Sequence, residues 1–163
     1  MFKIKNKIVL NLILIFAIFA LLFAYYVEYI LNHKPCNLCL IERIPYILTI
    51  IFITLNLIIK KFEKFILIIL SLIFVSATLL SFYHFGIEQG FIKESLVCDL
   101  NNENVNLSKE DLLKTLQKNT ISCKDVTFRI LGFSLATLNT ITSLILSIIT
   151  IKLYRNYEKN KQN

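Results

Sequence analysis

Four long apolar runs, each bounded by polar or charged residues, dominate the pattern of this chain. They cover residues 8–27, 41–59, 65–85 and 130–151. A helix of about 20 apolar residues crosses the hydrocarbon core of a bilayer, which is about 30 Å thick. Each run is about this long, so the pattern predicts an all-α polytopic membrane protein, a four-transmembrane-helix bundle.

The first run also shares features with the apolar core of a secretory signal peptide. Such a core has about 7–15 residues and ends at small residues spaced as in Ala-x-Ala. The stretch from Ile8 to Val27 is longer and lacks that ending, so we expect a retained helix. Tyr25, Tyr26 and Tyr29 stand where an interfacial belt of aromatic side chains is expected.

The composition fits one integral membrane domain over residues 1–163. The chain is 56% hydrophobic, whereas soluble domains are usually about 45–50% apolar. Two polar loops are expected, at about 28–40 and 86–129. Within the longer loop, residues 107–118 predict a short amphipathic helix capped by Ser108. This helix either lies on the membrane, with its lysines at the lipid headgroups, or folds back on the loop.

The net charge of +7 follows the membrane topology, and we infer no nucleic-acid partner from it. The N-terminal segment, the 60–64 turn and the C-terminal tail carry ten of the 18 Lys and Arg residues. Cytoplasmic loops are enriched in Lys and Arg, so we expect both termini in the cytoplasm. All four cysteines then lie on the outer side of a bacterial inner membrane, in the oxidising periplasm.

Cys36 and Cys39 form a Cys-x-x-Cys pair just before the second run. This spacing lets a disulfide open and close with little backbone movement, and it is typical of reactive thiols. At a membrane surface, the pair suggests redox chemistry with a molecule dissolved in the membrane. A static disulfide and half of a zinc site are the alternatives. Zinc usually needs a second such pair or two histidines, whereas His33 and His84 are far apart in sequence.

Cys98 and Cys123 lie in the long loop, with 24 residues between them. A disulfide between them would stabilise the loop by about 3 kcal/mol on the chain-entropy model. A second pair on the same side as the first also permits exchange between two disulfides, which is an electron relay. The sequence leaves two interpretations of Cys98 and Cys123 open, a structural disulfide and a redox-active pair.

Arg43 follows Cys39 by one helical turn, so both share a face if the helix has begun by residue 39. The guanidinium and the helix N-terminus would favour a thiolate at Cys39, and Arg43 could donate hydrogen bonds to a quinone. Snorkelling to headgroups or pairing with Glu42 are the alternatives. We expect Glu42 to be a solvated acid at the helix start. His84 is expected at the interface, as an ordinary residue or a hydrogen-bond donor to quinone.

Three segments of the chain carry specific motifs: Cys36-Asn37-Leu38-Cys39 with Glu42-Arg43-Ile44-Pro45-Tyr46, Tyr83-His84-Phe85-Gly86-Ile87-Glu88, and the stretch from Cys123 to Leu135. Together with the four spans and the long-loop cysteine pair, they follow one another in a specific order. In this order, residues 8–150 resemble the disulfide bond formation protein B (DsbB) family of membrane thiol:quinone oxidoreductases.

The resemblance implies an enzyme that reoxidises a soluble periplasmic dithiol oxidase of the DsbA type. The electrons would pass to ubiquinone or menaquinone, which sustains disulfide formation in other proteins. Cys98 would form the mixed disulfide with the partner, and Cys123 would complete the outer pair and exchange with Cys36.

The same resemblance implies that Cys39 is the thiolate that meets the quinone. Arg43 would stabilise that complex, and His84 matches a position near the quinone. Relatives often carry Trp in the long loop and after Cys123, whereas this chain has no Trp and carries Phe128 at the latter place. That difference concerns the partner-docking surface and leaves the chemistry intact.

Three alternatives come from other classes. A quinone-linked reductase of the vitamin K epoxide reductase type also uses a four-helix bundle and cysteine pairs, in a different order of motifs. A membrane scaffold would hold two static disulfides, which stay oxidised when quinone is depleted. A zinc-binding anchor would carry metal after purification.

Overall fold

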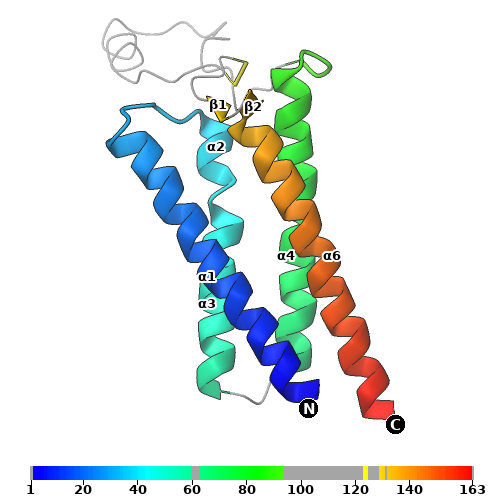
Figure 1. Cartoon of the computed structure of the whole chain (residues 1–163). Helices are drawn as coiled ribbons and strands as arrows, with labels where there is room; N and C mark the ends of the chain where they lie inside the picture. The colour runs from blue at the N-terminus through cyan, green and yellow to red at the C-terminus, as the bar shows by residue number, and fades with distance from the viewer. Residues whose placement is uncertain (1, 60–62, 94–122, 125–128, 131, 163) are drawn as a thin grey trace, which may run out of the picture.

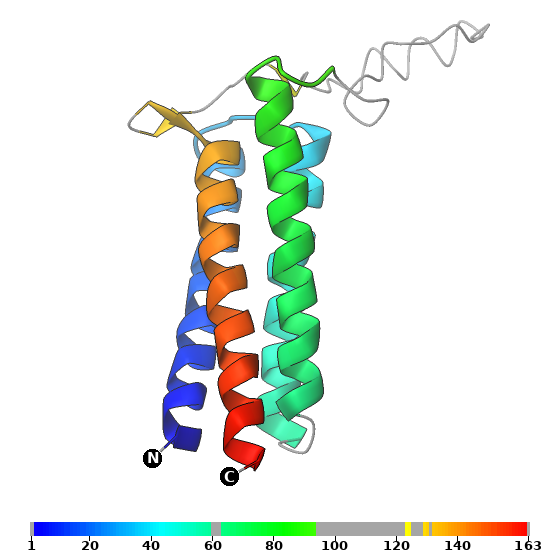
Figure 2. The same cartoon turned by 90° about the vertical axis from the view of Figure 1, so that its right-hand side faces the viewer.

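Four long helices stand side by side in the computed structural model, which describes residues 2–59, 63–93, 123–124, 129–130 and 132–162 (Figures 1 and 2). Both termini lie at one end of the bundle, and the short helix α2 and a β-hairpin lie at the other. The long helices are α1 (Phe2–Tyr29), α3 (Ile44–Ile59), α4 (Glu63–Glu88) and α6 (Leu135–Gln162). The predicted four-helix membrane bundle is therefore confirmed.

The outer faces of the helices are apolar, as expected for contact with lipid. Each span contains a window apolar enough to cross a membrane, and only 17–33% of that window is buried inside the bundle. Soluble monomers rarely expose apolar patches larger than a few hundred Å². Here large apolar side chains are exposed along every span, among them Ile15, Phe19, Ile58, Leu72 and Ile148.

The bundle is held together by an apolar core. Helix α1 packs on α3, α3 on α4, and α4 on α6, with the most extensive contact between the last two. Ile53, Leu70 and Phe74 at its centre have no exposed surface. We call the following set the apolar core: Leu10, Ile13, Ala17, Tyr46, Ile53, Ile66, Leu67, Leu70, Phe74, Leu146 and Leu153.

The second span is two helices rather than one. Helix α2 (Asn37–Ile41) ends at a two-residue turn, and α3 begins at Ile44. Pro45 lies in the first turn of α3, where its missing N–H is tolerated, but it cannot donate to the Ile41 carbonyl as a continuous helix would require. The turn sends the two charged residues between the helices, Glu42 and Arg43, toward different neighbours.

The fourth helix begins five residues later than predicted. We expected the span to start at Ile130, but strands β1 (Arg129–Ile130) and β2 (Phe133–Ser134) pair antiparallel there. Gly132 has φ +88°, a conformation that glycine adopts at little cost. Ser134 then caps α6, because its Oγ accepts a hydrogen bond of 3.1 Å from the Thr137 backbone N–H.

The other helix ends also differ from the expected spans. Helices α1 and α4 extend past the uncharged runs at both ends, and α6 continues through the basic tail to Gln162. Helix α4 begins at Glu63, within the expected 60–64 turn. The predicted amphipathic helix at 107–118 lies outside the described residues.

Candidate active site

The two cysteines of the Cys-x-x-Cys pair touch at the start of α2. The Sγ atoms of Cys36 and Cys39 are 2.7 Å apart, and no disulfide joins them. Cys36 is the N-cap of α2, and its Sγ accepts a hydrogen bond of 3.3 Å from the Cys39 backbone N–H. The short helix therefore holds the two sulfurs close enough that a disulfide needs little movement to form.

A third cysteine, Cys123, lies in the same apolar cluster as this pair. Cys36 and Cys123 are both buried, with 6% and 3% of their surface exposed. They belong to one apolar cluster with Leu38 and Ile87. Cys123 is disulfide-bonded, and its predicted partner, Cys98, lies outside the described residues. The structure thus brings an outer cysteine to the mouth of the bundle beside Cys36.

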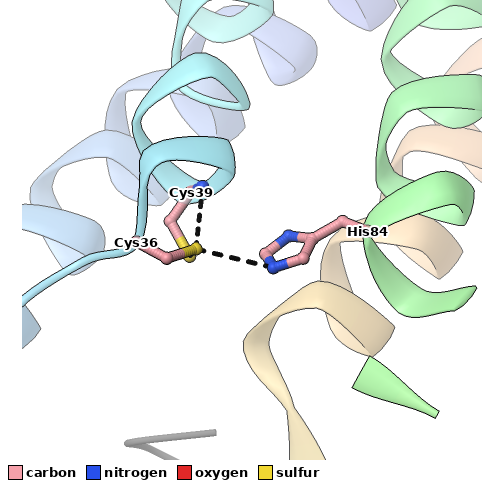
Figure 3. A group of neighbouring side chains, drawn as sticks. All are labelled: Cys36, Cys39 and His84. Atoms are coloured by element: carbon pink, nitrogen blue, oxygen red, sulfur yellow. Dashed lines mark hydrogen bonds between the residues drawn. The ribbon is translucent and has the colours of Figure 1, made fainter. Parts of the chain in front are cut away.

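His84 reaches the cysteine pair from α4 (Figure 3). Its Nε2 is 3.5 Å from the Cys36 Sγ, and its ring is 1% exposed. His84 therefore lies at the outer end of α4, where the sequence places it, and its ring is buried in the bundle. A buried histidine in contact with a reactive thiol is typical of catalytic sites.

Glu42 lies on the other side of the His84 ring, and its expected solvation is wrong. The residue is 8% exposed, and its Oε1 is 2.9 Å from the His84 Nδ1. Its second oxygen, Oε2, accepts a hydrogen bond of 2.8 Å from the Asn139 Nδ2 of α6. Burying a carboxylate is costly unless it is paired and hydrogen-bonded, and Glu42 satisfies both conditions.

Asn139 is the centre of a wider polar network. Besides Glu42, its Nδ2 donates to the Ser81 Oγ of α4 at 2.8 Å. Its Oδ1 accepts a hydrogen bond of 2.5 Å from the Tyr46 hydroxyl of α3. One side chain therefore ties together three elements around the cysteine end.

The surroundings of Cys36 favour its thiolate. Hydrogen bonding from the Cys39 thiol and the contact with His84 outweigh the effect of burial and lower the pKa of Cys36 to about 5. We had expected the helix N-terminus and Arg43 to favour the thiolate of Cys39. The structure instead favours Cys36, because Cys36 caps α2 and contacts His84.

Arg43 is held by α1 and not by Glu42, so the expected alternative of an Arg43–Glu42 pair is wrong. Its Nη1 is 2.6 Å from the Glu28 Oε2, and its guanidinium lies 5.0 Å from the centre of the Tyr25 ring. The side chain is 12% exposed. Arg43 therefore fixes the cysteine end of α3 against α1 while it still borders the cavity described next.

A cavity of about 380 Å³ lies between α1, α6 and the cysteine pair. Its polar wall contains Cys36, Cys39, Arg43 and His84, and its apolar wall contains side chains of α1 and α6: Phe16, Phe19, Phe23, Val27, Leu135 and Leu138. Sites for small molecules usually have volumes of about 300–1,000 Å³, with apolar walls and a few placed polar groups. The lining therefore suits a small molecule with a polar head and an apolar tail.

The same three side chains also form a set of potential metal ligands. Cys36, Cys39 and His84 place their ligand atoms within 4.8 Å of one another. The sequence argument against zinc was that no histidine stood at metal spacing, and folding brings one there. Tetrahedral zinc with Zn–S distances of about 2.3 Å separates two sulfurs by roughly 3.7 Å, whereas these sulfurs are 2.7 Å apart.

Several members of the site were missed from the sequence. Glu28, Tyr46 and Asn139 are polar residues within or beside apolar spans, and polar side chains at that depth usually have a partner or a function. Their partners come from other helices and from the α2–α3 turn, at separations of up to 97 residues. The spacing of residues within one segment therefore could not identify these three as members of the site.

The cysteine pair, a third cysteine and a buried histidine thus lie together at one end of a membrane bundle, an arrangement that fits an oxidoreductase. The chain belongs to the family of disulfide bond formation protein DsbB, whose model matches residues 6–153. It is therefore a membrane protein of disulfide formation, in a family that is linked to quinone in general.

A curated relative comes from Rickettsia prowazekii (strain Madrid E). This protein, named uncharacterized protein RP370, is 35% identical to the chain over 143 residues, which cover 86% of this chain and 83% of the relative. No solved structure matches the chain significantly.

Proposed function

We propose that this protein reoxidises a periplasmic dithiol oxidase of the DsbA type and passes the electrons to membrane quinone. Two thiols of the partner become a disulfide, and a quinone takes up the two electrons and two protons to become the quinol. The protein's own cysteines return to their starting state after each turnover. Ubiquinone and menaquinone both fit this chemistry.

The position of Cys36 is the observation that carries this proposal. Cys36 and Cys123 belong to one apolar cluster, and both border the cavity together with Cys39. Thiol–disulfide exchange requires a thiolate to reach a disulfide sulfur. A cysteine with one neighbour from the outer loop and another, Cys39, beside the cavity is suited to pass electrons inward.

Arg43, His84 and Cys39 are the residues proposed to border the quinone head. Arg43 supplies N–H donors at the polar wall, and Cys39 supplies the thiol that faces the same space. The phenylalanines of α1 and the leucines of α6 would contact the apolar tail. The proton-bearing groups of the site are thus next to the space where protons and electrons are needed.

In this proposal the partner meets Cys98 first, and Cys123 then exchanges with Cys36. The basic N-terminal segment, the 60–64 turn and the tail support a cytoplasmic location for both termini. The cysteine end lies opposite to the termini (Figure 1), so it would face the periplasm of a bacterial inner membrane.

The order of exchange is tested by trapping the covalent intermediate. The partner should lack its resolving cysteine, because a mixed disulfide persists only when no neighbouring thiolate releases it. We expect an adduct of the summed mass with wild type and with Cys36→Ser, and none with Cys98→Ser. An adduct that survives Cys98→Ser and disappears with Cys36→Ser would mean that the partner attacks the inner pair directly.

The orientation is tested in spheroplasts with a thiol reagent that cannot cross the membrane. After reduction, the reagent should label the native cysteines and spare a cysteine engineered in the 60–64 turn. The reverse pattern, with Cys36 and Cys39 protected and the engineered cysteine labelled, would invert the proposed topology.

A further inference from the structure

A continuous row of buried and partly buried polar atoms leads away from Cys36. The Cys36 Sγ is 3.5 Å from the His84 Nε2, and the His84 Nδ1 is 2.9 Å from the Glu42 Oε1. The Glu42 Oε2 accepts a hydrogen bond of 2.8 Å from Asn139. The row joins the cysteine motif, the α2–α3 turn, α4 and α6, and the exchange of disulfides alone does not require it.

The contacts of the His84 ring determine which nitrogen is available to the thiol. A carboxylate accepts hydrogen bonds and does not donate them, so the proton of a neutral His84 lies on Nδ1, toward Glu42. Nε2 then carries a lone pair and points at the Cys36 Sγ. Cys36 is 6% exposed and His84 is 1% exposed, so His84 is the proton acceptor nearest to hand for a thiol that contacts little bulk water.

We propose that His84 is the general base and acid for Cys36, and that Glu42, braced by Asn139, is the positioning residue that stabilises the His84 imidazolium. The proposal rests on the proposed function and adds to it, because thiol oxidation releases protons that a buried site must hold. A base oriented by a carboxylate follows the same physical logic as the triads of hydrolases.

The proposed step balances without any further reactant. The S–H bond of Cys36 breaks and an N–H bond forms at Nε2, while the electron pair remains on sulfur for attack on a neighbouring sulfur. The imidazolium is then paired with the Glu42 carboxylate. When Cys36 later leaves a disulfide as a thiolate, the same N–H stabilises it and can return the proton.

Several other charged groups lie near His84, and each could also change the pH at which Cys36 ionises. Glu88, on α4 itself, has its Oε1 4.0 Å from the His84 Nε2, and its Oε2 accepts a hydrogen bond from Ser134. From α1, the Glu28 carboxylate is paired with Arg43. His33 and Lys34, from the loop before α2, also border the cavity.

A carboxylate that acts only through its charge disfavours a nearby thiolate. Its removal should therefore lower the midpoint of the Cys36 thiol, the pH at which half of it is ionised. A carboxylate that acts through His84 has the opposite effect. Loss of Glu42 destabilises the imidazolium, so the thiol keeps its proton to a higher pH. Glu42→Gln and Glu88→Gln each remove one buried carboxylate near His84 and are therefore a matched pair.

The test measures the alkylation rate of Cys36 against pH in the full chain, purified in detergent, with Cys39, Cys98 and Cys123 replaced by Ser. Neither quinone nor partner is added. Each rate is divided by its plateau at high pH, so that only the midpoint is compared and differences in access cancel. We expect Glu42→Gln to raise the midpoint by about one pH unit, a tenfold loss of thiolate below it. Glu88→Gln should shift it less, because the nearest Glu88 oxygen is 4.0 Å from the His84 Nε2, beyond hydrogen-bond distance.

Two further variants keep the test decisive if Glu42→Gln folds poorly. His84→Gln removes the base and should raise the midpoint at least as much as Glu42→Gln, and Asn139→Ala should raise it by a smaller amount. A midpoint that does not rise in His84→Gln, or that falls in Glu42→Gln, overturns the proposal. These outcomes are independent of quinone reduction by wild type, whose absence would overturn the proposed function instead.

Discussion

The two ends of the bundle each contain an acid paired with a basic side chain, in very different surroundings. At the end with the termini, the Lys64 Nζ is 2.7 Å from the Glu158 Oε1, and these side chains are 48% and 43% exposed. At the cysteine end, the His84 Nδ1 is 2.9 Å from the Glu42 Oε1, and these side chains are 2% and 9% exposed. The two distances are similar, but only the second pair is buried.

Burial decides what each pair can do. Water screens an exposed pair, so such pairs contribute little to stability. A buried pair costs desolvation, and replacing it with apolar residues is often neutral or stabilising. Glu42 and His84 are therefore better explained by chemistry at Cys36 than by stability, whereas the apolar core supplies the packing that holds the helices together.

The largest expected effect comes from removing the thiol beside the cavity. Cys39→Ser should abolish quinone reduction, because the inner pair can no longer form a disulfide. The outer disulfide of Cys123 should still oxidise one equivalent of reduced partner. A stopped-flow assay of partner oxidation with quinone absorbance as the second signal separates the two. Continued quinone reduction by Cys39→Ser would remove this cysteine from the pathway.

A cavity in the apolar core should change stability without changing the thiol chemistry. Phe74 has no exposed surface, and replacing a buried phenylalanine with alanine typically costs about 3–5 kcal/mol. Phe74→Ala should lower the free energy of unfolding by this amount in a denaturation series in detergent. The alkylation midpoint of Cys36 should remain that of wild type. A shifted midpoint would show that the two regions are not separate.

Loss of the guanidinium should weaken quinone binding more than dithiol exchange. Hydrogen bonds to charged groups contribute about 1.5–3 kcal/mol, so Arg43→Ala should raise the apparent KM for quinone by roughly 10- to 150-fold. Glu28→Gln, which removes the partner of Arg43 and leaves the guanidinium, is the matched control and should have a smaller effect. An unchanged KM in Arg43→Ala would leave Arg43 with a structural role against α1.

The smallest effect is expected at the exposed pair. Lys64→Ala should leave quinone reduction unchanged. It should also leave the alkylation midpoint of Cys36 unchanged, because Lys64 is not among the neighbours that lower the pKa of this thiol. Below that midpoint the thiolate protonates and the alkylation rate falls. A shifted alkylation midpoint in Lys64→Ala would show that the exposed pair influences the chemistry at the cysteine end.

The fold could be predicted from the sequence to the extent that hydropathy determines it. Four apolar runs of bilayer length gave four helices, because lipid-facing helices need apolar residues whatever their neighbours are. The hairpin before α6 was missed, since residues 129–134 have the same apolar character as the helix that follows. The glycine at position 132 is the local sequence signal that could have indicated the turn, where it adopts φ +88°.

The site could be predicted only where its signal is local. The spacing of Cys36 and Cys39 identified the reactive pair, but the solvated state expected for Glu42 was wrong. Its burial depends on His84 and Asn139, which are 42 and 97 residues away. Contacts between different helices determine whether such a residue is buried, and the sequence pattern of one segment does not predict these contacts.

The most direct test of the central claim is the stoichiometry of electron transfer in the purified, anaerobic protein. Reduced DsbA-like partner and a water-soluble quinone are added in turn, and partner disulfide and quinol are measured together. The account predicts one quinol for each partner disulfide over many turnovers, with no reaction when either is left out. Partner oxidation that stops after the protein's own disulfides are consumed, while quinone remains unreduced, would contradict it.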